Sequence, residues 1–179
     1  MAERVMSPDH RLFVRRGSFE DWTRDRNRDR LDKIALDPRL LRDTSDRDLS
    51  TTVLGERISF PVMCAPAGAQ CASHPDGELA TARAAGVSET LMALPVGSGY
   101  SIEDVAEVAT GPIWFQHIHY SDAVTEILLP RLKPAGYSAV VLTVDALGPF
   151  DLDVRLHGHG ANPDSKMWGS LEGYEEMLD

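Results

Sequence analysis

The segment Ser138–Asp145 reads SAVVLTVD, and its pattern decides the fold class. Five of its first seven residues are apolar, which is typical of a strand in a parallel sheet that is buried on both faces. Thr143 and Asp145 are polar and stand at the carboxyl end of this run, where a side chain faces either a ligand or a structural hydrogen-bond partner. From the residues alone, a threonine bonded to a neighbouring strand is the favoured interpretation.

Similar apolar runs precede this segment at intervals of about 25 residues, and helical patterns separate them. The runs cover 60–66, 90–96 and 112–118, and the helical patterns cover 76–86, 101–110 and 122–136. Strands that alternate with helices predict βαβ units and a parallel sheet. Pro130 lies inside the last helical pattern, so we expect that helix to kink or to end early.

Upstream of these runs, the sequence predicts a helix over 19–35 and a small β-hairpin over 48–59 that turns at Gly55. Arginines concentrate in 15–30, but the interleaved acids favour a solvated or ion-paired segment.

Composition narrows the classes of partner. The chain has 179 residues and a formal net charge of −10, which argues against a nucleic-acid partner. It contains no run of 18 or more apolar residues, and its first residues lack the apolar core of a signal peptide. Its two cysteines, Cys64 and Cys71, suit a reducing compartment and are interpreted as packing residues. We therefore expect a cytoplasmic protein without a membrane partner.

Several segments carry a resemblance to a known family. They are DWTRDRNRDRLDKIALDPRLLRDTSDRDLSTTVLGERISFPVMCAPAG, HPDGELATARAAG, SIEDVAEVATGPIWFQ and AGYSAVVLTVD, within about 12–155. In order and spacing they resemble the FMN-dependent α-hydroxy-acid oxidases and dehydrogenases. The resemblance implies an α/β fold, the N-terminal half of a (β/α)8 TIM barrel with its first four βα units. It divides the chain into a helical extension over 1–47, a partial barrel over 48–155 and a divergent tail over 156–179.

The resemblance also implies a cofactor, FMN, and a substrate, a 2-hydroxy acid that is oxidised to a 2-oxo acid. The loop that contains Ala67 and Gly68 corresponds to a family loop whose backbone contacts the flavin. Gln116 corresponds to a family glutamine near the pyrimidine edge of the flavin, and Thr143 to a threonine that faces the same ring. These four residues are the expected cofactor-binding set.

Other positions depart from the family pattern. Ile118 stands where the family has a substrate-facing tyrosine, and Phe13-Val14 stands where it has another. Pro95-Val96 replaces a serine pair, and the loop at 148–150 lacks the substrate-binding arginine. The catalytic histidine, the arginine anchors and the flavin-stabilising lysine belong to the second half of the family barrel. We therefore expect no catalytic residue in this chain and no activity of the chain alone.

Two further possibilities remain open from the residues. A half-barrel exposes strand edges, which predicts self-association or a complementary half-barrel as the partner. The alternative function is a non-catalytic half-barrel that serves as a binding or assembly module. A tail helix from about Ser170 would then cover part of the open face. The pairs His117/His119 and His157/His159 could ligate a metal, but the first pair is expected to point toward the helices, so no metal site is predicted.

Overall fold

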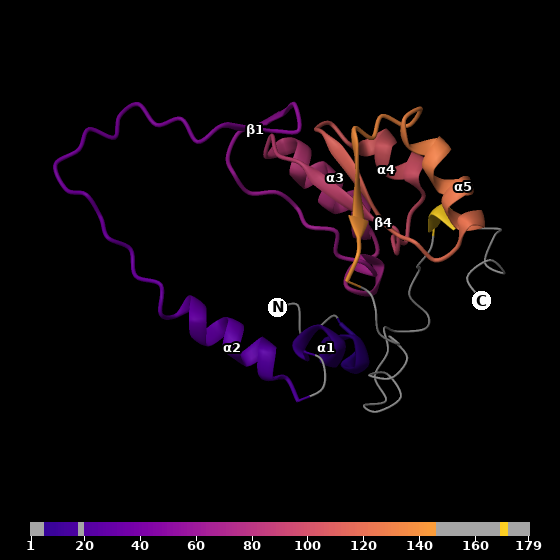
Figure 1. Cartoon of the computed structure of the whole chain (residues 1–179), viewed down its shortest axis with the longest axis horizontal. Coiled ribbons are helices and arrows are strands. Elements are labelled where there is room, and N and C mark those ends of the chain that lie inside the picture. The colour runs from indigo at the N-terminus through magenta and orange to yellow at the C-terminus, as the bar shows by residue number, and fades with distance from the viewer. Residues whose placement is uncertain (1–5, 18–19, 146–168, 172–179) are drawn as a thin grey trace.

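The centre of the fold is a three-stranded parallel sheet in the order β3 (Met92–Pro95), β4 (Ile113–Ile118) and β5 (Ala139–Thr143). This computed structural model describes residues 6–17, 20–145 and 169–171. Its register pairs Pro95 with Gln116 and Ile118 with Thr143, so the ends of the strands lie side by side (Figure 1). The predicted parallel α/β arrangement is confirmed.

The first expected strand, at 60–66, is reduced to one bridge. Cys64 pairs with Met92 in parallel, through hydrogen bonds from Cys64 N to Leu91 O (2.9 Å) and from Ala93 N to Cys64 O (3.0 Å). Pro61 and Pro66 flank this bridge, and proline has no N–H to donate to a sheet. The structure therefore shows three strands and a bridge, and the expected four complete βα units are not confirmed.

Helices cover one face of the sheet. They are α3 (Gly77–Val87), α4 (Ile102–Val108) and α5 (Asp122–Leu132). A capping box begins α4, because Ser101 Oγ accepts from Asp104 N and the Asp104 carboxylate accepts from Ser101 N. The third helix continues through Pro130 but ends at Leu132, short of the expected residue 136, so the prediction of an early end is confirmed.

The main core lies between the sheet and these helices. Its fully buried side chains include Leu94 and Phe115 from the strands, Val105 from α4 and Leu128 from α5. A smaller cluster on the other face of the strands joins Trp114 to Ile58 of the hairpin formed by β1 (Thr51–Val53) and β2 (Glu56–Ile58). Gly55 takes a φ of 89° in the hairpin turn, as its position predicts.

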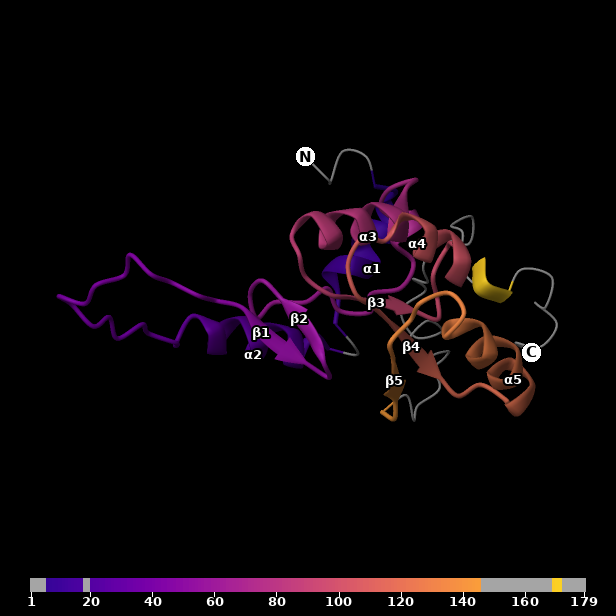
Figure 2. The same cartoon turned by 90° about the horizontal axis from the view of Figure 1, so that it is seen from above.

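The N-terminal region forms two helices and an arm. The first helix, α1 (Pro8–Arg15), was not predicted, although Ser7 caps it by accepting from His10 N. The second, α2 (Trp22–Leu31), lies within the predicted range 19–35 and has no buried residue. An extended arm over 32–50 follows and projects away from the sheet in both views (Figures 1 and 2).

The described part of the tail is a short 3-10 helix, η3 (Gly169–Leu171). Leu171 is fully buried in the cluster between the sheet and the helices. The tail segment therefore packs on the helical side, and the expectation that it covers the open face of the strands is wrong for these residues. The rest of the tail and the loop at 148–150 lie outside the described residues.

The outer edge of β5 carries exposed apolar side chains. Val140 and Leu142 pair in register with Phe115 and His117, so they share the face that the helices cover elsewhere. They are nevertheless 48% and 57% exposed, and Val144 beyond them is 74% exposed.

Within the described residues, no helix is long and apolar enough to cross a bilayer.

Replacing Leu94 with alanine should lower the free energy of unfolding by about 2–5 kcal/mol, because the truncation leaves a cavity in the main core. Urea unfolding followed by circular dichroism measures this value. Leu36 is 91% exposed on the arm, so the same replacement there is the matched control and should change stability by less than about 0.5 kcal/mol. Equal effects at the two positions would contradict the assignment of the core.

Candidate functional site

Gln116 and Thr143 meet at the carboxyl ends of β4 and β5. The Gln116 amide donates from Nε2 to Thr143 Oγ1 at 2.7 Å, and its Oε1 accepts from Val96 N at 3.1 Å. These two bonds fix which end of the amide carries the oxygen. The Gln116 side chain is buried, with 7% exposure. Because Thr143 accepts one bond through its hydroxyl oxygen, its O–H remains available as a donor. Thr143 therefore makes a structural hydrogen bond and still has one donor for a ligand.

The loop after the Cys64 bridge lies against the loop after β3. Ala69 donates from its backbone N–H to Gly97 O at 3.0 Å. A Cβ placed on Gly68 would lie 3.3 Å from the same oxygen, so a larger residue there would push the two loops apart. Ala67 and Gly68 are exposed, so their backbone is accessible. The short helix η2 (Gln70–Ala72) begins directly after this contact.

These contacts join the four predicted residues into one network. Gly97 contacts the loop of Ala67 and Gly68, while the adjacent Val96 holds Gln116, which in turn binds Thr143. The structure therefore brings the sequence-predicted set together along consecutive strand ends. We call this arrangement the strand-end network: Ala67, Gly68, Ala69, Val96, Gly97, Gln116 and Thr143.

The donors and acceptors of the strand-end network suit an uncharged, flat ligand edge. The Gln116 amide retains a second N–H, Thr143 retains its O–H, and the Gly68 backbone permits close approach. No member of the network is a cation that could form an ion pair with a phosphate. The described residues thus fit the ring end of a flavin such as FMN, whose pyrimidine edge carries carbonyl and N–H groups.

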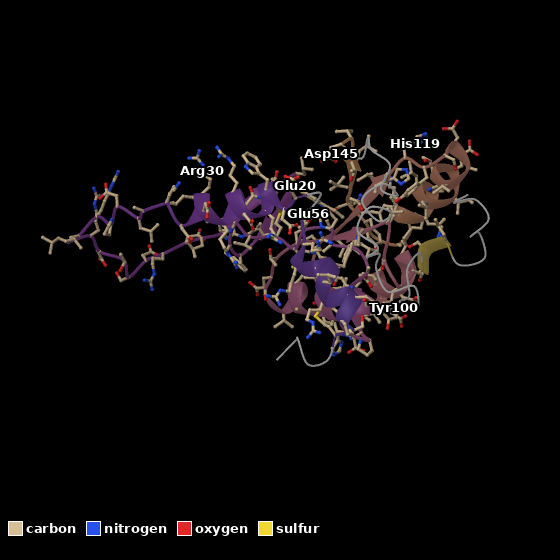
Figure 3. The ribbon with its side chains drawn as sticks, turned by 90° about the horizontal axis from the view of Figure 1, so that it is seen from below. Glu20, Arg30, Glu56, Tyr100, His119 and Asp145 are labelled. Atoms are coloured by element: carbon tan, nitrogen blue, oxygen red, sulfur yellow. The ribbon has the colours of Figure 1, made fainter. Side chains whose placement is uncertain are left out.

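The residues that differ from the family pattern lie on α1 and at the ends of β3, β4 and β5. Ile118 packs partly against the main core, and Phe13 and Val14 lie on α1 with 37% and 59% exposure. Asp145 is exposed beyond the end of β5 (Figure 3). Tyrosine hydroxyls are absent at 13, 14 and 118, as expected from the sequence.

Two polar residues near the network were missed by sequence reasoning. His10 is buried on α1, and its Nε2 lies 2.8 Å from Ser73 Oγ, which ties α1 to the loop after η2. Glu78 is completely buried in the first turn of α3. The Ser7-Pro8-Asp9 start of α1 is a recognisable helix signal, whereas no local pattern announces that Glu78 is buried.

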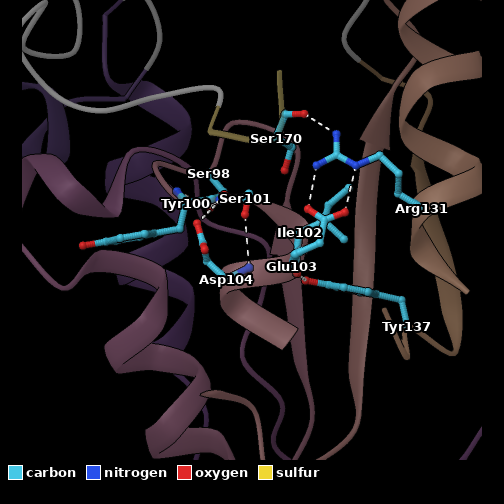
Figure 4. A network of polar contacts seen from close by, with 9 residues as sticks. All are labelled: Ser98, Tyr100, Ser101, Ile102, Glu103, Asp104, Arg131, Tyr137 and Ser170. Atoms are coloured by element: carbon cyan, nitrogen blue, oxygen red, sulfur yellow. Dashed lines mark hydrogen bonds and ion pairs between the residues drawn. The ribbon is translucent and has the colours of Figure 1, made fainter. Parts of the chain in front are cut away.

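A separate polar network ties α4, α5 and η3 together (Figure 4). Arg131 makes two contacts with the Glu103 carboxylate, Nη2 to Oε2 at 2.6 Å and Nε to Oε1 at 2.9 Å, and a third with Ser170 O. The hydrogen bonds from Arg131 lower the pKa of Glu103. Tyr137 donates to Ile102 O at 3.0 Å, and its burial, together with the Glu103 charge, raises its pKa. These contacts hold α4, α5 and η3 together, and none of their residues belongs to the strand-end network.

His117 on β4 and His119 just after it both lie against α5, in the direction predicted. His117 Nε2 and His119 Nδ1 lie 3.0 and 3.3 Å from Thr125 Oγ1, which donates its own proton to Ser121 O. The threonine oxygen therefore accepts from the rings. Among the described residues, no three metal-ligating side chains gather in a cluster. The second pair, His157 and His159, lies outside the described residues.

A cavity of about 990 Å³ lies between α1 and α2, where arginines predominate in its lining. Its charged residues include Arg16, Arg28 and Arg24, the last of which is paired with Asp21 and Asp25. None of the four predicted site residues lines this cavity. The strand-end network is therefore the better candidate site.

Comparisons with known proteins identify the family of the chain. The profile of the FMN-dependent dehydrogenase family matches residues 2–157. Glycolate oxidase 1 of Zea mays is 43% identical over 142 residues, which cover 78% of this chain and 38% of the relative. Glycolate oxidase of Spinacia oleracea is 40% identical over the same length, with the same coverage. The chain thus spans well under half the length of these relatives.

Solved structures give the same result. A mandelate oxidase with (S)-2-phenylpropionate has a TM-score of 0.84 and 31% identity, over 94% of this chain and 51% of that one. A monotopic membrane protein, (S)-mandelate dehydrogenase, has a TM-score of 0.76 and 30% identity, over 81% and 39% of the two chains.

Burial lowers the pKa of His117, and the neighbouring His119 lowers it further. Below about pH 6.5 the unfolded chain therefore binds a proton at this residue more readily than the folded chain does. We expect the free energy of unfolding to fall as the pH drops through about 6.5, and His117→Leu to flatten that fall. Histidine ring-proton shifts followed against pH by NMR give the check. A His117 midpoint above the ordinary value would contradict it.

Proposed function

The chain belongs to the FMN-dependent dehydrogenase family, and from that premise we propose that the strand-end network holds the ring end of FMN in an enzyme that oxidises a 2-hydroxy acid to a 2-oxo acid. When bound, FMN supplies the acceptor for the hydride that leaves the substrate. The observation that carries the proposal is the Gln116–Thr143 hydrogen bond at the ends of β4 and β5.

Each member of the network has a defined task in this proposal. Gln116 presents its second amide N–H to the pyrimidine edge of the ring, held in orientation by Val96 and Thr143. The Thr143 hydroxyl donates toward the same edge. The exposed backbone of Ala67 and Gly68 lies against the ring. None of these groups moves a proton from the substrate, so their role is binding and orientation.

The substrate class rests on the relatives. Those named above are glycolate oxidases, and one structural neighbour is a mandelate oxidase bound to benzoyl-formic acid, a 2-oxo acid. A base for the hydroxyl proton and a cation for the carboxylate are both required by this chemistry. The strand-end network supplies neither. We therefore propose that the chain is inactive alone and that a complementary half-barrel supplies these groups.

Two exposed apolar surfaces support a complementary half-barrel. One is the stripe of Val140, Leu142 and Val144 on β5, whose outer edge pairs with no other strand within the described residues and could therefore accept a further strand. The other is the arm, which leaves large side chains in water, including Leu36 at 91% exposure and Leu40 at 81%. Exposed apolar surface of this extent is typical of an interaction site.

A second candidate function is a non-catalytic half-barrel that serves in binding or assembly. The observation that favours it is the absence of a tyrosine hydroxyl at Val14 and at Ile118, within the segment that matches the family.

Titration of FMN into residues 1–179, followed by quenching of flavin fluorescence, tests the cofactor proposal. We expect binding, and a roughly three- to tenfold weaker affinity for Thr143→Val, which corresponds to the loss of one hydrogen bond. Thr52→Val on the exposed face of β1 is the matched control and should leave the affinity unchanged. Absence of binding, or equal effects of both substitutions, would contradict the proposed site.

A mixing experiment tests the reaction. The portion of Zea mays glycolate oxidase 1 that this chain does not match is purified and combined with residues 1–179 and FMN. We expect oxidation of glycolate by the mixture and none by either polypeptide alone. Turnover by residues 1–179 alone would contradict the need for a second half, and an FMN-binding complex without turnover would favour the assembly role.

A further inference from the structure

Glu78 is a buried carboxylate whose described partners are hydrogen-bond donors from η2 and from the loop after β3. It is 0% exposed, and no described residue forms an ion pair with it. Its Oε1 accepts from Gln70 N at 3.1 Å and its Oε2 from Gly99 N at 3.2 Å, while Cys71 Sγ lies 3.6 Å from Oε2. A buried carboxylate is costly unless such bonds satisfy it, so each loop donor is part of what keeps it there.

The two loops that Glu78 joins are the loops of the strand-end network. Gln70 and Cys71 follow Ala67, Gly68 and Ala69, and Gly99 lies two residues after Gly97. The loops also touch each other through the bond from Ala69 N to Gly97 O. One carboxylate on α3 thus binds the backbone of both segments.

The path from Glu78 to Gln116 is short and passes through the second loop. Gly99 is held by Glu78 Oε2, and Val96, three residues earlier in the same loop, holds Gln116 Oε1. We expect loss of the bond at Gly99 to loosen this loop and, with it, the position of the Val96 N–H. The Gln116 amide would then be free to rotate away from Thr143.

We propose that Glu78 is a positioning residue for the flavin: through Gln70 and Gly99, its carboxylate sets the spacing of the two loops and the orientation of Gln116. This inference rests on the proposed function for the identity of the ligand. Glu78 does not touch the ring, and it acts only through the backbone that does.

The chemistry of this position requires two acceptor oxygens. Ionised glutamate offers both oxygens as acceptors, whereas glutamine has one acceptor and one NH₂ donor. In Glu78→Gln the NH₂ group must face either the Gln70 N–H or the Gly99 N–H, and two donors repel. The substitution keeps the size and shape of the side chain, so its effect isolates the loss of one anchor.

The test compares Glu78→Gln with Glu103→Gln in residues 1–179. Glu103 is the matched control, because it is also a first-turn helix carboxylate with defined partners, but it binds Arg131 and lies outside the strand-end network (Figure 4). Three readouts are taken for each variant: melting temperature, FMN affinity by fluorescence quenching, and hydrogen exchange at the amides of Gln70 and Gly99.

We expect Glu78→Gln to weaken FMN affinity at least tenfold and to accelerate exchange at Gln70, Gly99 and Val96, while exchange in α5 stays slow. Glu103→Gln should lower the melting temperature and leave FMN affinity unchanged. Equal loss of melting temperature in the two variants with unchanged FMN affinity in both would overturn the positioning role, since Glu78 would then only stabilise the fold.

The two proposals fail in different ways. If the unsubstituted chain does not bind FMN, the proposed function is contradicted, and Glu78 is judged by hydrogen exchange alone. Faster exchange confined to the two loops in Glu78→Gln then supports its role as their common anchor. Unchanged exchange, or exchange accelerated throughout the sheet, overturns it.

Discussion

Parallel pairing of β3, β4 and β5 is the constraint on which the other features of this molecule depend. Parallel strands need helical connections, and these helices bury one face of the sheet in the main core. The alternation of side chains then directs Phe115 and His117 toward the helices and Trp114 and Gln116 to the opposite face. Because the strands run the same way, their carboxyl ends meet at one edge. Gln116 and Thr143 become neighbours for that reason.

The same constraint explains why the outer edge of β5 is apolar. A strand with the sequence AVVLT has side chains suited to burial on both faces, and among the described strands it pairs with β4 alone. Val140 and Leu142 lie on the helical face and remain half exposed, while Ala139 and Val141 pack toward the hairpin cluster. A complementary half-barrel would bury both the edge and the stripe, which connects the packing of this chain to its proposed activity.

Much of the fold could be predicted from the sequence, because long apolar runs and capping residues are local signals. The runs at 90–96, 112–118 and 138–145 all became strands, and Ser101 begins α4 with its capping box. The run at 60–66 looked equivalent, but its prolines remove the N–H donors that a ladder needs. The helix α1 has a clear Ser-Pro start that periodicity alone does not reveal. For the site, the predicted residues do lie together, whereas burial of Glu78 arises from loops distant in sequence and leaves no local signature.

We propose above that the Gln116–Thr143 pair binds the ring end of FMN and is not only a structural hydrogen bond. The most direct measurement is the NMR spectrum of residues 1–179 as FMN is added, with the Gln116 side-chain NH₂ and the Thr143 methyl group assigned. If the pair binds the ring end of FMN, both signals should shift together with the backbone amides of Ala67 and Gly68. Shifts confined to the arginines of the cavity between α1 and α2, with the Gln116 and Thr143 signals unmoved, would contradict it.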